Sequence, residues 1–93
     1  MELENERLAI NQIDEQLIRL FVKRMEIAGK IAQYKQEHHL PIRDTSREEE
    51  ILRNLCAQVP ENLQDASVRL YQLLFELSRS QQQKIMQKEE ASR

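Results

Sequence analysis

The sequence predicts an all-α fold of three helices, one long, one short and one medium-long, which we expect to be intertwined with a second copy in a homodimeric helical bundle. Turn-forming residues are scarce, with one Gly and two Pro in 93 residues. Leu, Ile, Glu, Gln, Lys and Arg, which favour helices, make up most of the chain. Apolar residues recur at three- and four-residue steps in three segments. A chain of this length has room for one domain, which we take as residues 1–93.

The composition is that of a soluble cytoplasmic protein. Hydrophobic residues make up 40% of the chain and charged residues 32%, a balance unlike that of a disordered or membrane protein. The formal net charge of −2 gives no reason to expect nucleic acid or an anionic membrane as a partner. The lone Cys56 has no intramolecular disulfide partner, which indicates a reducing compartment. Acidic residues stand where a signal peptide needs a basic start, and no apolar run approaches ~18 residues.

The longest helix is predicted from Leu3 to about Tyr34. Nothing interrupts its apolar seam before Pro41, which we expect to end it. Gly29 lies inside this helix at a cost of ~1 kcal/mol relative to Ala. This glycine either marks a close contact with another helix or is merely tolerated. The seam consists of Ile10, Ile13, Leu17, Leu20, Ile27, Ile31 and Tyr34.

The short and the medium-long helix follow in the second half of the chain. Any of residues 44–46 can cap the short helix, and Pro60 ends it. The apolar face of this helix is Ile51, Leu52, Leu55 and Val59. The last helix begins between Glu61 and Asp65, and its polar tail, Lys88 to Arg93, is expected to fray. The helical pattern runs through Leu70, Leu73, Leu74, Leu77, Gln81 and Ile85.

The first helix is too long for a compact monomer. About 35 residues in a helix span ~52 Å, whereas a compact chain of this size has a radius of gyration of ~12 Å and a diameter near ~32 Å. About a third of the helix would therefore project with its Leu/Ile seam in water. A second copy, with the long helices paired antiparallel, would cover this seam, so the sequence predicts a homodimer.

Several polar side chains occupy positions where the helical pattern calls for apolar ones. Arg24 lies in the seam of the first helix, and Lys35 follows ~16 Å along the axis and roughly 20° away in azimuth. A buried guanidinium costs several kcal/mol unless an anion meets it. Glu48 faces inward on the second helix, as do Ser78 and Gln82 on the third. Two cations, a carboxylate, a hydroxyl and an amide suit a small ligand that carries carboxylates and a hydroxyl.

Each of these residues also has a purely structural interpretation. Arg24 can be an ion-pair partner of Glu48. Ser78 can return its hydroxyl to the carbonyl four residues earlier, and Gln82 can belong to a solvated strip with the neighbouring glutamines. An aspartate at position 44 needs no role beyond capping a helix. The case for a ligand site therefore depends on the whole set of residues and not on one of them.

Eight residues spread over the chain form one pattern: Arg7, Arg24, Lys35, Asp44, Arg47, Glu48, Ser78 and Gln82. It contains a D-x-x-R-E element at residues 44–48, with a lysine nine residues before its aspartate. This pattern resembles the all-helical class of chorismate mutases, and the resemblance covers Leu3 to about Ile85. It implies a stand-alone member of bacterial or archaeal type, without a fused domain.

The resemblance implies an isomerase that converts chorismate to prephenate, a Claisen rearrangement in the shikimate pathway that leads to phenylalanine and tyrosine. By similarity, Arg7 and Arg24 hold the two carboxylates of the substrate. Lys35 and Gln82 would be the catalytic residues, which donate hydrogen bonds to the ether oxygen where negative charge grows in the transition state.

The remaining residues of the pattern bind other parts of the substrate, by the same similarity. Asp44 and Glu48 accept from the ring hydroxyl, Ser78 lies beside a carboxylate, and Arg47 positions Glu48. The reaction moves no proton, so no cofactor and no metal is expected. The adjacent histidines 38–39 face different ways on a helix and do not form a metal site.

Arg7 is expected to act in the pocket of the neighbouring subunit. It lies ~25 Å from Arg24 along the same helix and ~42 Å from Lys35, gaps that no arginine side chain spans. In an antiparallel pair of long helices, the N-terminal end of one chain lies beside the Arg24–Lys35 stretch of the other. The sequence therefore predicts that Arg7 is supplied in trans.

Two other functions stay open at this point. An isochorismate-pyruvate lyase shares the fold and the class of chemistry, although its loop lacks an acid placed like Asp44. A non-catalytic helical dimer that regulates another pathway enzyme would combine an exposed Leu/Ile patch with a closed pocket.

Overall fold

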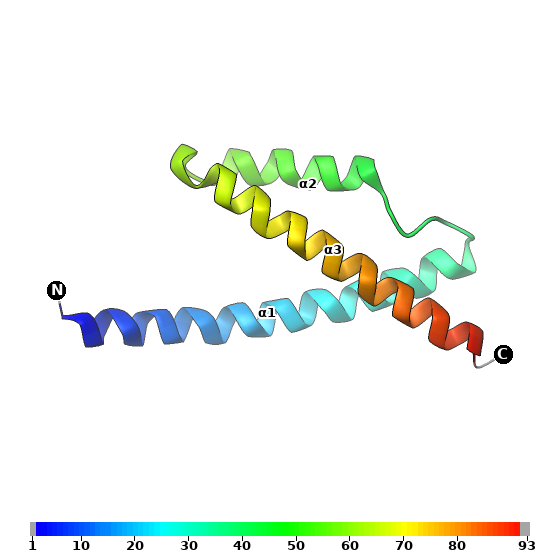
Figure 1. Cartoon of the computed structure of the whole chain (residues 1–93), viewed down its shortest axis with the longest axis horizontal. Coiled ribbons are helices and arrows are strands. Elements are labelled where there is room, and N and C mark those ends of the chain that lie inside the picture. The colour runs from blue at the N-terminus through cyan, green and yellow to red at the C-terminus, as the bar shows by residue number, and fades with distance from the viewer. Residues whose placement is uncertain (1, 92–93) are drawn as a thin grey trace.

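The computed structural model describes residues 2–91, which form three α-helices. They are α1 (Leu3–Glu37), α2 (Thr45–Gln58) and α3 (Glu61–Ala91). No strand occurs in residues 2–91, and the predicted all-α class of one long, one short and one medium-long helix is confirmed. Figure 1 shows α3 running beside α2 and then crossing the C-terminal half of α1. None of the described helices is long and apolar enough to cross a membrane.

The end of α1 is a Schellman turn. The N–H of Leu40 donates to the carbonyl of Lys35 at 2.8 Å, and the N–H of His39 donates to the carbonyl of Gln36 at 3.3 Å. His39 has a φ of 55°, the left-handed conformation that this turn requires. The helix reaches Glu37, three residues further than the sequence pattern predicts. This extension keeps Lys35 in the last helical turn, where its side chain has a defined direction.

Hydrogen bonds at both ends of α2 fix its place in the fold. The carboxylate of Asp44 accepts from the N–H of Arg47 at 3.0 Å, so Asp44 is the N-cap among the three candidates. At the other end, Gln64 donates through Nε2 to the carbonyl of Cys56 at 3.0 Å, which satisfies a free carbonyl of the last turn. Helix α3 begins at Glu61, the first residue of its predicted range.

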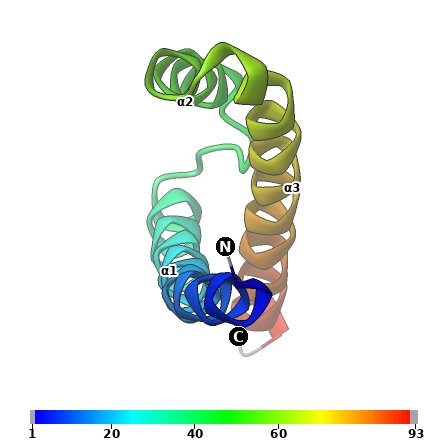
Figure 2. The same cartoon turned by 90° about the vertical axis from the view of Figure 1, so that its left-hand side faces the viewer.

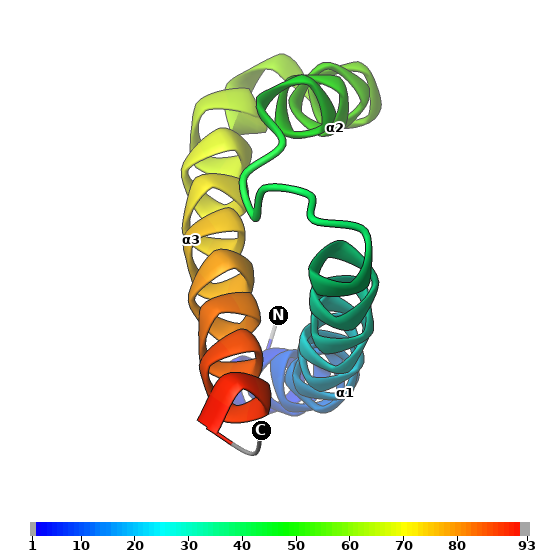
Figure 3. The same ribbon diagram turned by 90° about the vertical axis from the view of Figure 1, so that its right-hand side faces the viewer.

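Helix α3 packs against both other helices, whereas no Cα atom of α1 lies within 8 Å of one of α2. Figures 2 and 3 show α1 and α2 beside different ends of α3 and on the same side of it. The buried residues all lie where α1 and α3 cross: Ala28, Gly29, Ala32, Phe75, Ser78 and Gln82. No large side chain of the described residues is fully buried. One chain alone therefore builds a small core with both apolar and polar members.

The apolar seam of α1 is exposed in the single chain. The side chains of the predicted seam are between 43% and 65% exposed, from Ile31 to Leu20. The molecule extends over 58 × 27 × 14 Å, and its radius of gyration is 16.8 Å, against ~12 Å for a compact chain of this length. Its accessible surface is 7762 Å², against about 5,700 Å² for a folded monomer of this mass. The homodimer expected from the sequence stays a prediction, and this surface is what it would cover.

Gly29 lies at a close approach between α1 and α3. A Cβ atom added there would be 2.6 Å from Cδ1 of Ile85. Of the two interpretations that the sequence allows for this glycine, the close helix contact is therefore confirmed. Together with its small neighbours Ala28 and Ala32, Gly29 lets the two helix backbones come near each other.

Gly29→Ala should stabilise the protein only where position 85 leaves room for the new methyl group. Alanine is favoured over glycine inside a helix by about 1 kcal/mol. In the wild-type chain the methyl displaces the Ile85 side chain, so we expect a smaller gain or a loss. In an Ile85→Val background, which lacks Cδ1, the gain should reach about 1 kcal/mol. Urea unfolding followed by circular dichroism, at one protein concentration, measures all four free energies. Equal effects of Gly29→Ala in the two backgrounds would contradict the contact.

Candidate active site

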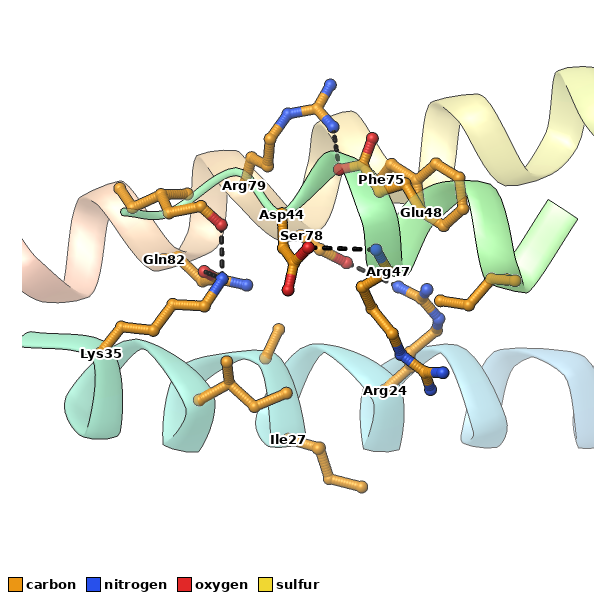
Figure 4. Close-up of a pocket in the computed structure, with 14 residues that line it drawn as sticks. Arg24, Ile27, Lys35, Asp44, Arg47, Glu48, Phe75, Ser78, Arg79 and Gln82 are labelled. Atoms are coloured by element: carbon orange, nitrogen blue, oxygen red, sulfur yellow. Dashed lines mark hydrogen bonds and ion pairs between the residues drawn. The ribbon is translucent and has the colours of Figure 1, made fainter. Parts of the chain in front are cut away.

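A cavity of about 350 Å³ lies between α1, α3 and the beginning of α2, which is within the ~300–1,000 Å³ range of small-molecule sites. In Figure 4, residues from all three helices and from the segment before α2 surround one space, with Lys35, Asp44 and Gln82 pointing into it and Arg79 directed away from it. The apolar lining residues are Ile27, Ala28, Ile31, Ile42, Ile51 and Phe75. The polar lining residues are Arg24, Lys35, Asp44, Arg47, Glu48, Ser78, Arg79 and Gln82. The cavity thus contains six of the seven predicted substrate-binding residues.

The two cations that α1 contributes to the cavity have only neutral partners. Arg24 donates through Nη1 to Oγ of Ser78 at 2.6 Å, and Lys35 donates through Nζ to the carbonyl of Ile42 and to Oε1 of Gln82, the latter at 3.4 Å. Neither cation forms an ion pair with a carboxylate of the described residues. The structural alternative in which Arg24 pairs with an inward glutamate is therefore wrong. Half-buried cations without a counter-charge are typical of an anion-binding site.

Ser78 and Gln82 of α3 face the core, as the sequence predicts. Ser78 is 9% exposed and Gln82 is 7% exposed, four residues apart on one face of the helix. The alternative of a solvated glutamine strip is therefore wrong for Gln82. The amide oxygen of Gln82 faces Lys35, so its NH₂ group is left to donate to a ligand. The hydroxyl of Ser78 accepts from Arg24 across the helix crossing.

The two carboxylates of the cavity differ in how they are held. Asp44 accepts from a backbone N–H of its own helix, so it both caps α2 and lines the cavity. The side chain of Glu48 is only 18% exposed, and its Oε2 accepts from Nη1 of Arg79. Nε of Arg43 lies 3.9 Å from the other oxygen, Oε1, too far for a hydrogen bond.

The partner expected for Glu48 is wrong. Arg47 does not position it, because Nη1 of Arg47 is bound to Oε1 of Glu50 at 2.6 Å. Arg79 takes that place, and the sequence interpretation missed it. A signal for it was present, since Arg79 follows Phe75 by four residues and precedes Gln82 by three, which places all three on one helix face.

Arg7 lies outside this cavity. It forms an exposed ion pair with Glu4 at 3.4 Å and lines only a hollow formed by residues 3–11 of the same helix. Its own chain therefore does not bring Arg7 to the other predicted site residues. This position agrees with the expectation that Arg7 acts outside its own subunit, which stays a prediction.

The arrangement can bind a small anion, orient it and stabilise charge that develops on it. Arg24 and Lys35 stand at the two ends of the cavity, with the free donor group of Gln82 near Lys35. The carboxylate of Asp44 faces the same space from the segment before α2, and that of Glu48 is turned toward Arg79. No group of three or more His, Cys, Asp or Glu side chains in the described residues could hold a metal ion.

Residues 6–83 match the family described as chorismate mutase type II. A protein of Enterobacter agglomerans, named bifunctional chorismate mutase/prephenate dehydratase, is 38% identical over 81 residues, which is 85% of this chain and 21% of that protein. A protein of the same name from Escherichia coli is 34% identical over 93 residues, with 94% of this chain and 24% of that protein covered.

A shorter relative comes from Methanocaldococcus jannaschii and is named chorismate mutase. It is 29% identical over 86 residues, which is 87% of this chain and 84% of that protein. This chain therefore spans about a fifth of the length of the bifunctional relatives and most of the length of the Methanocaldococcus jannaschii protein.

Proposed function

This chain belongs to the chorismate mutase type II family, and on that premise we propose that it converts chorismate to prephenate. The observation that carries the proposal is the pair of half-buried cations, Arg24 and Lys35, which have no carboxylate partner and flank a cavity with a free amide donor. Chorismate is a small dianion with a ring hydroxyl, so it needs cationic partners for its carboxylates and an acceptor for its hydroxyl. A cytoplasmic location is part of the same proposal.

To accelerate a Claisen rearrangement, a protein needs only to hold the substrate in its reactive shape and to stabilise the charge that develops. The substrate must be held in a compact conformer, and restricting a flexible molecule in this way supplies part of the rate enhancement. Negative charge grows on the ether oxygen as its C–O bond breaks, and fixed donors at that oxygen stabilise the transition state more than the ground state. An acceleration of order 10⁶ requires ~8 kcal/mol, which several such contacts supply together.

Six of the eight polar residues that line the cavity contact the substrate in this proposal. Arg24 binds one carboxylate, and Ser78 lies beside it because the two are already hydrogen-bonded. Lys35 and Gln82, which are adjacent, donate to the ether oxygen. The ring hydroxyl donates to the acceptors at the beginning of α2, Asp44 and Glu48. An acid at position 44 also favours chorismate mutase over isochorismate-pyruvate lyase, the other activity of this chemical class.

A second copy of the chain would complete the site. One chain exposes roughly 2,000 Å² more surface than a compact monomer of its mass. For comparison, the interfaces of obligate dimers bury 2,000–5,000 Å² or more, counted over both chains together. The exposed seam of α1 supplies the apolar part of such an interface. In an antiparallel arrangement of two α1 helices, Arg7 of the second copy reaches the cavity and binds the other carboxylate.

Lys35→Ala should be the most damaging single change in the cavity. It removes a charged donor to the breaking bond, and loss of one such donor costs about 10²–10³ in rate. Stability should hardly change, because Lys35 lies in the last turn of α1. The decrease in chorismate absorbance measures turnover in the wild type and the variant, and prephenate is identified as the product. A folded variant that keeps more than about a tenth of wild-type turnover would remove Lys35 from this role.

The same assay decides the proposed function itself. Wild-type protein that leaves chorismate unchanged would contradict it. Salicylate and pyruvate produced from isochorismate would identify the lyase instead.

Gln82→Glu should convert the reaction into one that depends strongly on pH. The introduced carboxylate repels the growing charge on the ether oxygen, whereas the protonated carboxyl donates in place of the amide. Activity should therefore be low at pH 8 and recover substantially toward pH 5, following the titration of that carboxyl. The ratio of kcat/KM of variant to wild type across this range is the measurement. A flat ratio would mean that Gln82 does not contact the ether oxygen.

Arg7→Ala and Lys35→Ala should complement each other in mixed dimers. The two inactive homodimers are unfolded, mixed in equal amounts and refolded, so that about half of the dimers are mixed. Each mixed dimer has one site with its own Lys35 and an intact Arg7 from the other chain, and one site that lacks both. About a quarter of wild-type activity should return. If mixed dimers form and activity does not return, Arg7 does not act in trans.

A further inference from the structure

We propose that Arg79 is a positioning residue for the reaction, which orients the carboxylate of Glu48 and neutralises its charge inside an anion-binding cavity. This inference rests on the proposed function, since it assigns Glu48 to the ring hydroxyl of the substrate. Arg79 acts through Glu48 and need not touch the substrate itself.

The contact joins two helices at the wall of the cavity. Figure 4 shows the guanidinium of Arg79 on α3 reaching the carboxylate of Glu48 on α2. The side chain of Arg79 is 24% exposed and that of Glu48 is 18% exposed, so solvent screens this pair less than the other ion pairs of the described residues, all of which contain a side chain at least half exposed. The ion pair with Arg79 therefore restricts the side chain of Glu48 more than its attachment to α2 alone would.

The geometry leaves one oxygen of Glu48 for a ligand. Arg79 occupies Oε2, whereas Oε1 accepts no hydrogen bond from the described residues. A carboxylate has acceptor positions on both oxygens, and a bond to one of them restricts rotation of the group. Glu48 lines the cavity, and we expect a hydroxyl of the ligand to donate to this second oxygen.

Besides orienting the carboxylate of Glu48, Arg79 acts through its positive charge. A carboxylate in a site for a dianion repels the ligand, and this repulsion grows in a cavity with little water. The arginine offsets it, so that Glu48 can accept a hydrogen bond without weakening the attraction from Arg24 and Lys35. Loss of Arg79 should therefore raise KM as well as lower kcat.

Arg43 provides a matched control within the same chain. Its Nε lies 3.9 Å from Oε1 of Glu48, but the side chain of Arg43 is 65% exposed and makes no hydrogen bond to that carboxylate. Arg43 also does not line the cavity. Arg43→Met removes the same charge and the same type of side chain near the same glutamate.

The test is a double-mutant cycle on chorismate turnover. Arg79→Met should lower kcat/KM by about 10- to 100-fold, the range that one charge-assisted hydrogen bond supplies. Arg43→Met should stay within about twofold of wild type, because an exposed ion pair without a hydrogen bond contributes little. Arg79→Lys should recover most of the loss, because the bond uses one nitrogen and an ammonium can replace it. In a Glu48→Gln background, Arg79→Met should change kcat/KM by less than about threefold.

Circular dichroism and size-exclusion chromatography check that every variant is folded and has the same oligomeric state. If Arg79→Met is equally costly with and without the Glu48 carboxylate, or no more costly than Arg43→Met, the positioning role is overturned. If wild-type protein does not turn over chorismate, the proposed function fails instead, and the two failures are distinct.

Discussion

The close crossing of α1 and α3 is the contact on which both the core and the site depend. Small residues on α1, with Gly29 directly against Ile85, let the helices approach. The same crossing brings Arg24 opposite Ser78 and Lys35 opposite Gln82. The polar lining of the cavity is therefore part of the core of the chain. A change that separates the helices would alter the spacing of the cations and the stability at once.

A core built in this way cannot be large, which makes the second copy important. The described residues contain no large side chain that is fully buried, and the seam of α1 faces outward. Hydrophobic burial is the main favourable term in folding, so a single chain lacks much of the stabilisation that a compact domain of this length obtains. In the proposed dimer, both the folding of the chain and the completion of the site would require the second copy. Both would therefore depend on protein concentration.

The periodicity of apolar residues in the sequence predicted the features that depend on the direction of the Cα–Cβ bonds, which sets the helix face on which a side chain lies. Three helices, a helix cap within residues 44–46 and the inward direction of Ser78 and Gln82 all follow from spacing and local chemistry. The partners of long side chains do not, because an arginine reaches several helix positions from one Cα atom. Arg47 therefore binds Glu50 and not Glu48 as expected, and Arg79, for which the sequence predicted no role, binds Glu48. The homodimer and the role of Arg7 in trans concern a second chain and stay predictions.

The way in which the charges are paired explains how a chain of net charge −2 can attract a dianion. Each carboxylate of the cavity already has a donor, since Asp44 caps α2 and Glu48 is bound to Arg79. The two cations of the cavity, Arg24 and Lys35, have only a hydroxyl, a carbonyl and an amide oxygen as partners. Neutral partners orient a cation without cancelling its charge, so the cavity keeps a positive potential in the direction of the ligand. Fixed charges of this kind need no rearrangement when the transition state forms, which is the property that a reaction without proton transfer requires of its protein.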